Sequence, residues 1–408
     1  MMSHPRPSFS EVGDLVTFDE VSATGNAFAK MTVLHITSLS LSYFRNHLHT
    51  RFDLSPAPVV LMGANGSGKT SVLEAVSMLA PGRGLRKAKL SELSHVRGGQ
   101  PWVVSARGQG RAGEVQIGTG LDPQQDERRV VRINSRTVRG HSELTEHLAM
   151  LWLTPQIEQL FQEGSGAERK FMDRLVYGFD PAHAARVQDY EQTMRERNRL
   201  LQDGRSEHHW LAALEQSMAE KASAIAASRL EALEHINRAM MDGGHSFPKA
   251  HLAVSGWLED RLCAGDPAVA TEQAFAEALA ASRMADAGAG RALLGTHRSQ
   301  LNVLHLGKHM PAGLCSTGEQ KAVLLSIVLA QARASMHWKR LIPILLLDEV
   351  ATHLDSTRRL ELFEEICQIG AQVWMTGTDA ALFDGLGRRA QYFRIEEGKV
   401  FHSDTSSS

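Results

Sequence analysis

The chain has 408 residues, enough for two domains or for one domain with a large insertion, and 43% of its residues are hydrophobic, which supports a packed core. Its 44 basic and 46 acidic residues leave a net charge of −2, which excludes a uniformly basic nucleic-acid-coating protein and confines any such contact to local patches. Three widely spaced cysteines exclude a disulfide framework or metal cluster, and no apolar run is long enough for a membrane span, so we expect a cytoplasmic protein with no membrane contact.

The composition of the ends of the chain differs from that of its centre. Short apolar runs of strand type dominate both ends of the chain, and a central stretch is rich in Ala, Leu, Glu and Arg at helical spacing. We therefore predict an α/β domain that is split by an inserted, mainly helical lobe. The expected parts are an N-terminal extension at residues 1–30 that we expect to be disordered, with Met31 as an alternative start, the split domain at 31–150 and 289–402, the helical lobe at 151–288 and a tail at 403–408.

A glycine-rich segment follows the short apolar run Val59–Met62. It reads Gly63-Ala64-Asn65-Gly66-Ser67-Gly68-Lys69-Thr70 and precedes an expected helix. Glycines let the backbone wrap closely around phosphate, and the start of the helix adds a favourable dipole. This strand, loop and helix predict an ATP and Mg²⁺ site in which Lys69 contacts the β- and γ-phosphates and the hydroxyl of Thr70 binds the metal. The alternative is a chance Gly-rich turn.

Two groups of basic residues follow the loop, one after its helix and one on a strand-like segment. Each contact with a phosphate would make binding to DNA depend on salt. The plain alternative is a solvated charged face. We see no base-reading motif, so any specificity is expected for DNA shape rather than sequence. The DNA-contact candidates are Arg83, Arg86, Lys87, Lys89, Arg129 and Arg132.

Ser316-Thr-Gly318-Glu319 precedes a long apolar helical run. Ser followed three residues later by Glu predicts a capping box at the start of a helix. Such a helix start also attracts anions. Because the Lys69 loop already has its own helix start, we expect Ser316, Gly318 and Glu319 to close over the γ-phosphate held by a second copy of the chain.

Two adjacent acids, Asp348 and Glu349, end the apolar run Ile344–Leu347. Acids at the end of a buried strand suit two roles, in which Asp348 holds Mg²⁺ and Glu349 orients or deprotonates the attacking water. A strand that ends in solvated acids is the alternative. Together with the phosphate loop, the pair predicts hydrolysis, with Glu349, Lys69 and Asp348 as catalytic residues.

These segments, with Ala351-Thr-His-Leu-Asp355, resemble the signature, Walker B and D-loop of the ATP-binding cassette superfamily. Within it, the chain resembles the RecF family of bacterial DNA-gap repair proteins over residues 31–400. Phe44-Arg-Asn46, Pro81–Arg86 and Thr376-Gly-Thr-Asp379 support this resemblance. It implies an α/β ATPase head with an inserted helical lobe, like the heads of Rad50 and SMC proteins.

The resemblance also implies a function and further site residues. It implies an ATP-dependent homodimer on duplex or gapped DNA, slow DNA-stimulated ATP hydrolysis, RecO and RecR as partners, and loading of RecA at single-strand gaps in recombinational repair. Asp355 of the D-loop and Gln156 at the lobe junction become nucleotide-binding candidates. An ordinary polar residue at a helix start is the alternative reading of Gln156.

Two departures from the pattern bear on the site. Transporters of the superfamily carry a histidine where this chain has Thr376-Gly-Thr378, so Thr378 is expected to sense the γ-phosphate instead. The family's Gly-Pro-His-Arg-Asp-Asp is replaced by Gly295-Thr-His-Arg-Ser-Gln300, which has no acid and therefore weakens any metal role there.

Two other function classes stay open on the sequence. An ATPase subunit of a membrane transporter is disfavoured by the missing histidine, the inserted lobe and the basic clusters. A module that binds ATP without hydrolysing it is disfavoured by the pair Asp348 and Glu349.

Overall fold

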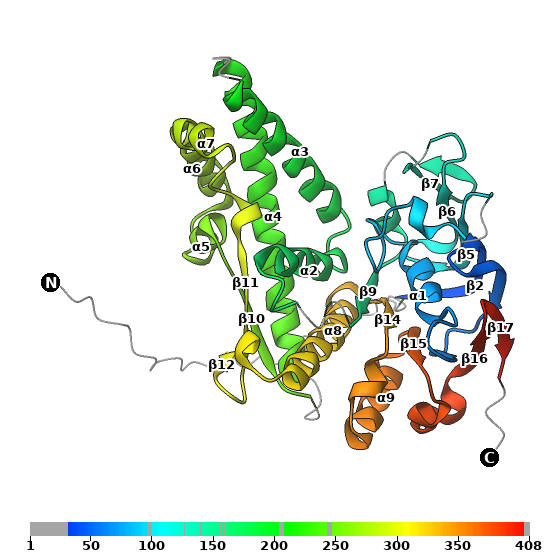
Figure 1. The fold of residues 1–408 in the computed structure, drawn as a ribbon. Helices are drawn as coiled ribbons and strands as arrows, with labels where there is room; N and C mark the ends of the chain where they lie inside the picture. The colour runs from blue at the N-terminus through cyan, green and yellow to red at the C-terminus, as the bar shows by residue number, and fades with distance from the viewer. Residues whose placement is uncertain are drawn as a thin grey trace, which may run out of the picture. The chain divides into compact units, whose positions relative to one another are not determined.

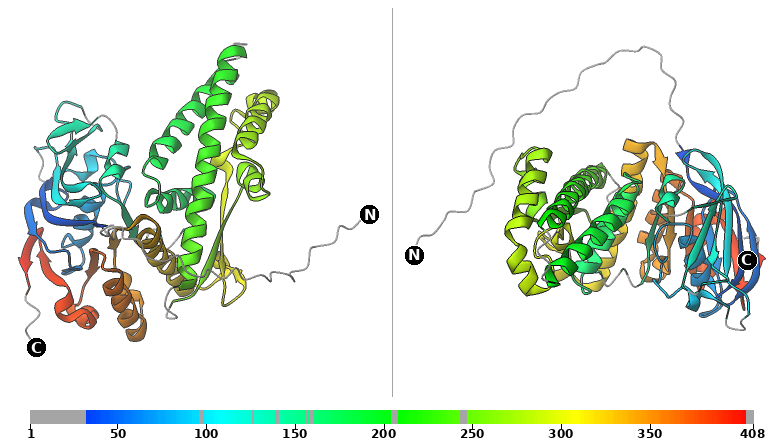
Figure 2. Two further views of the ribbon diagram at one scale, coloured as in Figure 1. Left: turned by 180° about the vertical axis from the view of Figure 1, so that it is seen from behind. Right: turned by 90° about the horizontal axis from the view of Figure 1, so that it is seen from above.

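The computed structural model describes residues 32–95, 99–125, 127–138, 141–155, 157, 160–203, 208–242 and 247–403. Within them, the strands at the two ends of the chain form two six-stranded sheets, and the helices of the central stretch gather on one side of them (Figures 1 and 2). The predicted α/β fold with an inserted helical lobe is therefore confirmed. The N-terminal extension and residues 404–408 lie outside the described residues.

The first sheet holds the strands that end at the predicted nucleotide site. Its order is β17-β16-β4-β15-β14-β9, and all neighbours are parallel except the hairpin β16–β17. Four of its strands, β4, β15, β14 and β9, are buried along their whole length because helices or a second sheet cover both faces, which explains their continuous apolar sequences. The strands are β4 (Val59–Met62), β9 (Met150–Leu153), β14 (Ile344–Leu347), β15 (Val373–Gly377), β16 (Gln391–Glu396) and β17 (Lys399–His402).

The second sheet is antiparallel, in the order β3-β2-β5-β6-β7-β8. Its inward-facing residues, such as Leu39 and Leu41, pack on the helix α1 (Lys69–Ser77), which lies between the two sheets and contributes Val72 and Leu73 to the same core. This packing fixes the start of α1 at the end of β4. The strands are β2 (His35–Phe44), β3 (His47–Asp53), β5 (Val103–Gly110), β6 (Gly113–Leu121), β7 (Arg129–Ile133) and β8 (Arg136–Val138).

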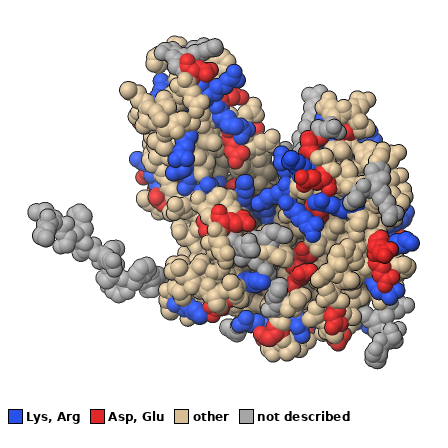
Figure 3. Space-filling model, in the orientation of Figure 1, with Lys and Arg blue, Asp and Glu red and all other residues tan. Residues whose placement is uncertain are grey.

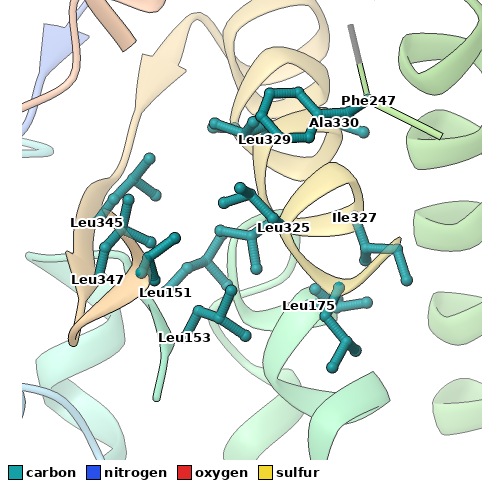
Figure 4. Packing of buried hydrophobic residues seen from close by; sticks show 14 of the residues in the cluster. Leu151, Leu153, Leu175, Phe247, Leu325, Ile327, Leu329, Ala330, Leu345 and Leu347 are labelled. Atoms are coloured by element: carbon teal, nitrogen blue, oxygen red, sulfur yellow. The ribbon is translucent and has the colours of Figure 1, made fainter. Parts of the chain in front are cut away.

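Two helices cover the other face of the first sheet, α8 (Thr317–Lys339) and α9 (Ser356–Ile369). Figure 4 shows Leu325 of α8 packed toward Leu345 and Leu347 of β14 and toward Leu151 of β9. The short strands β1 (Thr32–Val33) and β13 (Leu341–Ile342) form a separate parallel pair just before β14. Burial of α8 on this sheet and on the helical lobe joins the two halves of the fold.

The helical lobe contains six helices and a small antiparallel sheet in the order β10-β11-β12. Buried ion pairs tie its helices together, since Arg197 of α3 lies 3.0 Å from Glu215 of α4 and 2.7 Å from Asp286 of α7. The elements are α2 (Ser165–Tyr177), α3 (His183–Gln202), α4 (His208–Asp242), α5 (Trp257–Cys263), α6 (Ala268–Ala281), α7 (Arg283–Ala289), β10 (Ala250–Ser255), β11 (Gln300–His305) and β12 (Met310–Pro311).

Strand pairing places two elements close to the predicted boundaries of the lobe. The strand β9 spans the boundary at residue 151 and lies in the first sheet beside β14. The strand β11 follows the boundary at residue 288 and pairs with β10 of the lobe. The exact limits of the lobe stay a prediction. None of the helices in the described residues has the length and apolar character needed to cross a membrane.

Candidate nucleotide-binding site

The loop between β4 and α1 has a backbone that requires glycine at three positions. Gly63, Gly66 and Gly68 have φ values of 152°, 80° and 118°. A Cβ on Gly68 would stand 2.6 Å from Nδ2 of Asn46 and 2.7 Å from Nε2 of His47, and one on Gly63 would stand 2.3 Å from the carbonyl oxygen of Ile395. Neighbouring residues therefore pack closely against one side of the loop, and its opposite side remains available to a ligand.

Asn46, in the turn between β2 and β3, and His47, the first residue of β3, contact the back of this loop. The side-chain amide of Asn46 donates to the carbonyl of Ser67 at 2.8 Å, and Nε2 of His47 lies 3.1 Å from the carbonyl oxygen of Gly68. Burial lowers the pKa of His47 despite its hydrogen bonds to backbone carbonyls. The backbone N–H of Gly398, in the β16–β17 turn, also donates to Ser67. Sequence reasoning missed this bracing role, although Asn46 stood in a quoted motif.

Lys69 is buried and turned onto its own loop. Its amine donates to the carbonyl oxygens of Gly63 at 2.6 Å and of Ala64 at 2.9 Å. Burial lowers its pKa, and the negative charges of Glu349 and Asp348 oppose that shift. The amine therefore lies inside the phosphate loop and close to both acids.

Asp348, which follows β14, contacts the start of α1. The hydroxyl of Thr70 donates to Oδ1 of Asp348 at 3.1 Å, although 278 positions separate the two residues. Asp348 is buried, and burial raises its pKa. The structure thus brings Thr70, Lys69 and Asp348 together as the sequence predicted.

Thr376, at the end region of β15, contacts both acids. Its hydroxyl donates to Oδ1 of Asp348 at 2.7 Å and accepts from the backbone N–H of Glu349 at 2.8 Å. Glu349 itself has a left-handed backbone with φ of 56°. Thr378, the predicted sensor, is exposed beyond the end of β15, and its role stays a prediction. Sequence reasoning singled out this segment but did not predict the contact of Thr376 with Asp348.

The predicted capping box is confirmed at the start of α8. The backbone N–H of Ser316 donates to Oε2 of Glu319 at 3.1 Å, and the reciprocal contact of the box is also present. Lys308, 2.5 Å away, and then Ser316 lower the pKa of Glu319 to about 2. Ser316 and Gly318 are exposed. Among the described residues, no hydrogen bond or ion pair joins Ser316 or Glu319 to the phosphate loop.

Two further residues were predicted to bind nucleotide, Asp355 and Gln156. Asp355 is exposed and caps α9, where its Oδ1 accepts from the backbone N–H of Arg358 at 2.9 Å, so a structural role accompanies the predicted nucleotide contact. Gln156 lies outside the described residues.

The DNA candidates divide into exposed and buried side chains. Arg129 is a correction, because it is buried and its guanidinium donates to the hydroxyl of Thr119 at 2.7 Å and to the carbonyl of Gly82 at 2.8 Å, with a further bond to the carbonyl of Met78. Arg86 is exposed and lies 3.9 Å from the buried Glu74. The other four candidates are exposed: Arg83, Lys87, Lys89 and Arg132.

Comparisons with known proteins show the family of the chain. The model of the RecF/RecN/SMC N terminal domain family matches residues 35–399. The chain is 46% identical to the "DNA replication and repair protein RecF" of Mesorhizobium japonicum, covering 90% of this chain and 97% of that protein. It is 44% identical to the protein of the same name from Rhizobium leguminosarum bv. trifolii, covering 90% and 98%.

Solved structures share the fold at lower identity. A structure described as the recombination mediator protein RecF with ATP has a TM-score of 0.80 at 21% identity, covering 93% of this chain and all of that one. An SMC head bound to the C-terminal winged-helix domain of ScpA has a TM-score of 0.54 at 15% identity, covering 91% and 98%. These likenesses show the head-type fold. With its site geometry and its close relatives, the chain belongs to the RecF family.

Proposed function

We propose that the chain is a DNA-binding ATPase of recombinational repair that closes as a dimer around ATP. The observation that carries this proposal is the division of the site. Lys69, Thr70 and Asp348 lie together in one copy, whereas the capped helix start at Ser316 is exposed and makes no described contact with them. A second copy that brings its Ser316 and Gly318 to the γ-phosphate completes the site.

The residues present fit ATP with Mg²⁺. The hydroxyl of Thr70 and the carboxylate of Asp348 offer the oxygen ligands that Mg²⁺ prefers, and phosphate oxygens and water would fill its remaining positions. When bound, Mg²⁺ supplies positive charge against the phosphates. Lys69 would then exchange the carbonyls of Gly63 and Ala64 for phosphate oxygens, which are stronger acceptors because they are charged.

Glu349 is the proposed group that orients or deprotonates the attacking water. Its backbone N–H donates to the hydroxyl of Thr376, so the backbone at Glu349 is held from β15. Release of the dimer after hydrolysis would free the DNA. A weak, DNA-stimulated rate of ATP hydrolysis fits a protein in which ATP controls association. The alternative function as a transporter subunit is not supported by relatives named for DNA replication and repair.

Duplex or gapped DNA is the proposed ligand of the dimer, contacted by the exposed cations Arg83, Lys87, Lys89 and Arg132. RecO and RecR are the proposed partners, with RecA as the protein loaded. This rests on family membership and on a similar structure that is described as part of the RecFOR pathway.

Substitution E349Q tests the shared site. Removal of the base should slow hydrolysis and leave ATP binding intact, so the variant should sediment as a dimer with ATP and Mg²⁺ and as a monomer without them. The double variant E349Q/S316R is the control, because it blocks the partner's helix start and should stay monomeric. A monomeric E349Q that binds ATP contradicts the proposal. An ATPase rate per subunit that does not change with protein concentration would also contradict it.

A further inference from the structure

Four cations line a hollow between the segment Ala80–Lys87 and the helix α2. A cavity of about 500 Å³ has Arg83 and Lys87 on one side and Lys170 and Arg174 of α2 on the other. A second cavity of about 200 Å³ shares Lys87, Lys170 and Arg174. Figure 3 shows Lys and Arg side chains gathered along the hollow between the helical lobe and the sheets.

Arg174 has an aromatic neighbour but no acidic partner among the described residues. Its guanidinium stacks over the ring of Trp152, with the central carbon 4.0 Å from the ring centroid. Its Nη1 is shut off from solvent and has no hydrogen-bond partner among the described residues. Burial lowers the pKa of Arg174 to about 10.

Three buried arginines of the chain show what is missing at the partly buried Arg174. Arg197 and Arg229 are paired with buried carboxylates, and Arg129 donates to carbonyl oxygens. Buried charges are normally paired in this way because an unpaired one is costly to desolvate. The Arg174 site therefore has the character of half of an ion pair.

The acids near the cavity do not neutralise it. Asp173 is taken by Arg229, which lies 2.9 Å away, and by His183 at the same distance. Glu191 faces Arg195 at 3.8 Å, and Glu163 lines only the smaller cavity. The pKa of Lys87 is lowered by burial and by the charges of Arg174 and Lys170, while Glu163 opposes that shift. The three cations thus repel one another at close range.

We propose that this basic cavity, lined by Lys87, Lys170 and Arg174, binds phosphate groups. Its size suits one or two phosphates or a short polyphosphate and is too small for a duplex. The phosphates come either from the backbone of DNA that passes over the hollow or from a free polyphosphate, and the first source rests on the DNA-binding function proposed above. Because α2 belongs to the helical lobe and Ala80–Lys87 to the sheets, a bound phosphate would hold the two together.

The variant K87Q/K170Q tests this site without disturbing the core, because both lysines are exposed. Affinity for a 30-base-pair duplex is measured over a range of salt concentrations, and affinity for tripolyphosphate is measured by calorimetry with ATP saturating the phosphate loop. K399Q is the matched control, since Lys399 is an exposed lysine on β17 at the opposite edge of the first sheet from β9, which carries Trp152.

If DNA is the source, the slope of log affinity against log salt should fall by roughly 1–2 in K87Q/K170Q relative to K399Q, because each lost phosphate contact removes about 0.9. If a free polyphosphate is the source, tripolyphosphate binding should weaken at least about tenfold in the same comparison. R174Q removes the third positive charge and should reproduce either loss without a lower unfolding temperature, since the charge it removes is unpaired. Equal values for K87Q/K170Q and K399Q in both measurements overturn the proposal. Dimerisation of E349Q with ATP is measured in the absence of DNA. Failure of the dimer model is therefore distinguished from failure of this phosphate site.

Discussion

At the residue scale, one hydroxyl connects Asp348, the proposed ligand of Mg²⁺, with Glu349, the proposed catalytic residue. Thr376 donates to Asp348 and accepts from the N–H of Glu349, so it fixes the direction of one carboxylate and the backbone of the next residue. It is fully buried, and no water can easily replace it. Groups that orient metal ligands in this way strongly influence metal affinity.

We expect T376V to raise the Mg²⁺ concentration needed for half-maximal ATPase rate by about 10–100-fold, because Asp348 loses the donor that orients it. T376S keeps the hydroxyl and should restore most of the rate. Magnesium titrations of steady-state hydrolysis give the values. T378V is the matched control at the exposed threonine; if T378V is impaired and T376V is not, the sequence-based role of Thr378 is right and ours for Thr376 is wrong.

At the element scale, the end of α1 depends on a distant strand. Arg129 of β7 donates to the carbonyls of Met78 and Gly82, just after α1 ends, and so satisfies acceptors that have no partner within the helix. This ties the second sheet to the helix that begins in the phosphate loop.

Replacement R129M should lower the free energy of unfolding by about 2–3 kcal/mol, because it leaves buried carbonyl oxygens without a charged donor. Urea unfolding followed by circular dichroism measures the loss. R132M, at an exposed position of the same strand, should change stability by less than about 0.5 kcal/mol. If R129M is as stable as R132M but weakens DNA binding, the original DNA assignment of Arg129 stands.

A second prediction at this scale concerns the ion pair between α2 and α4. Burial alone would raise the pKa of Asp173, but Arg229 and His183 outweigh it and hold the pKa below its ordinary value. A lowered folded-state pKa adds stability above the unfolded value near 3.9, and that stability is lost as pH falls through the folded value.

D173N should therefore cost about 3–5 kcal/mol at pH 7, and the difference from the unaltered chain should shrink as pH falls below about 4. Urea unfolding at several pH values measures both. D53N is the control, since Asp53 forms an exposed pair with Arg51. A difference that stays constant with pH would show that Asp173 stabilises the lobe only by packing.

At the scale of the whole molecule, the sequence revealed the fold and the main site because both depend on local patterns. Buried strands gave continuous apolar runs, and the phosphate loop and the two acids are short motifs. The contact of Thr376 with Asp348 could not be read in this way, since it requires β15 to lie between β4 and β14. The error at Arg129 was avoidable, because Arg129, Val131 and Ile133 alternate on one buried face of β7.

The brace on the phosphate loop has a consequence for how the protein is made. The loop is synthesised early, but the N–H that Gly398 donates to Ser67 belongs to a turn made some 330 residues later, and the Asp348 site also comes late. A ribosome that stops before this turn releases a chain that carries the complete motif without its support. A product that ends before Gly398 therefore lacks one of the hydrogen bonds that hold the phosphate loop.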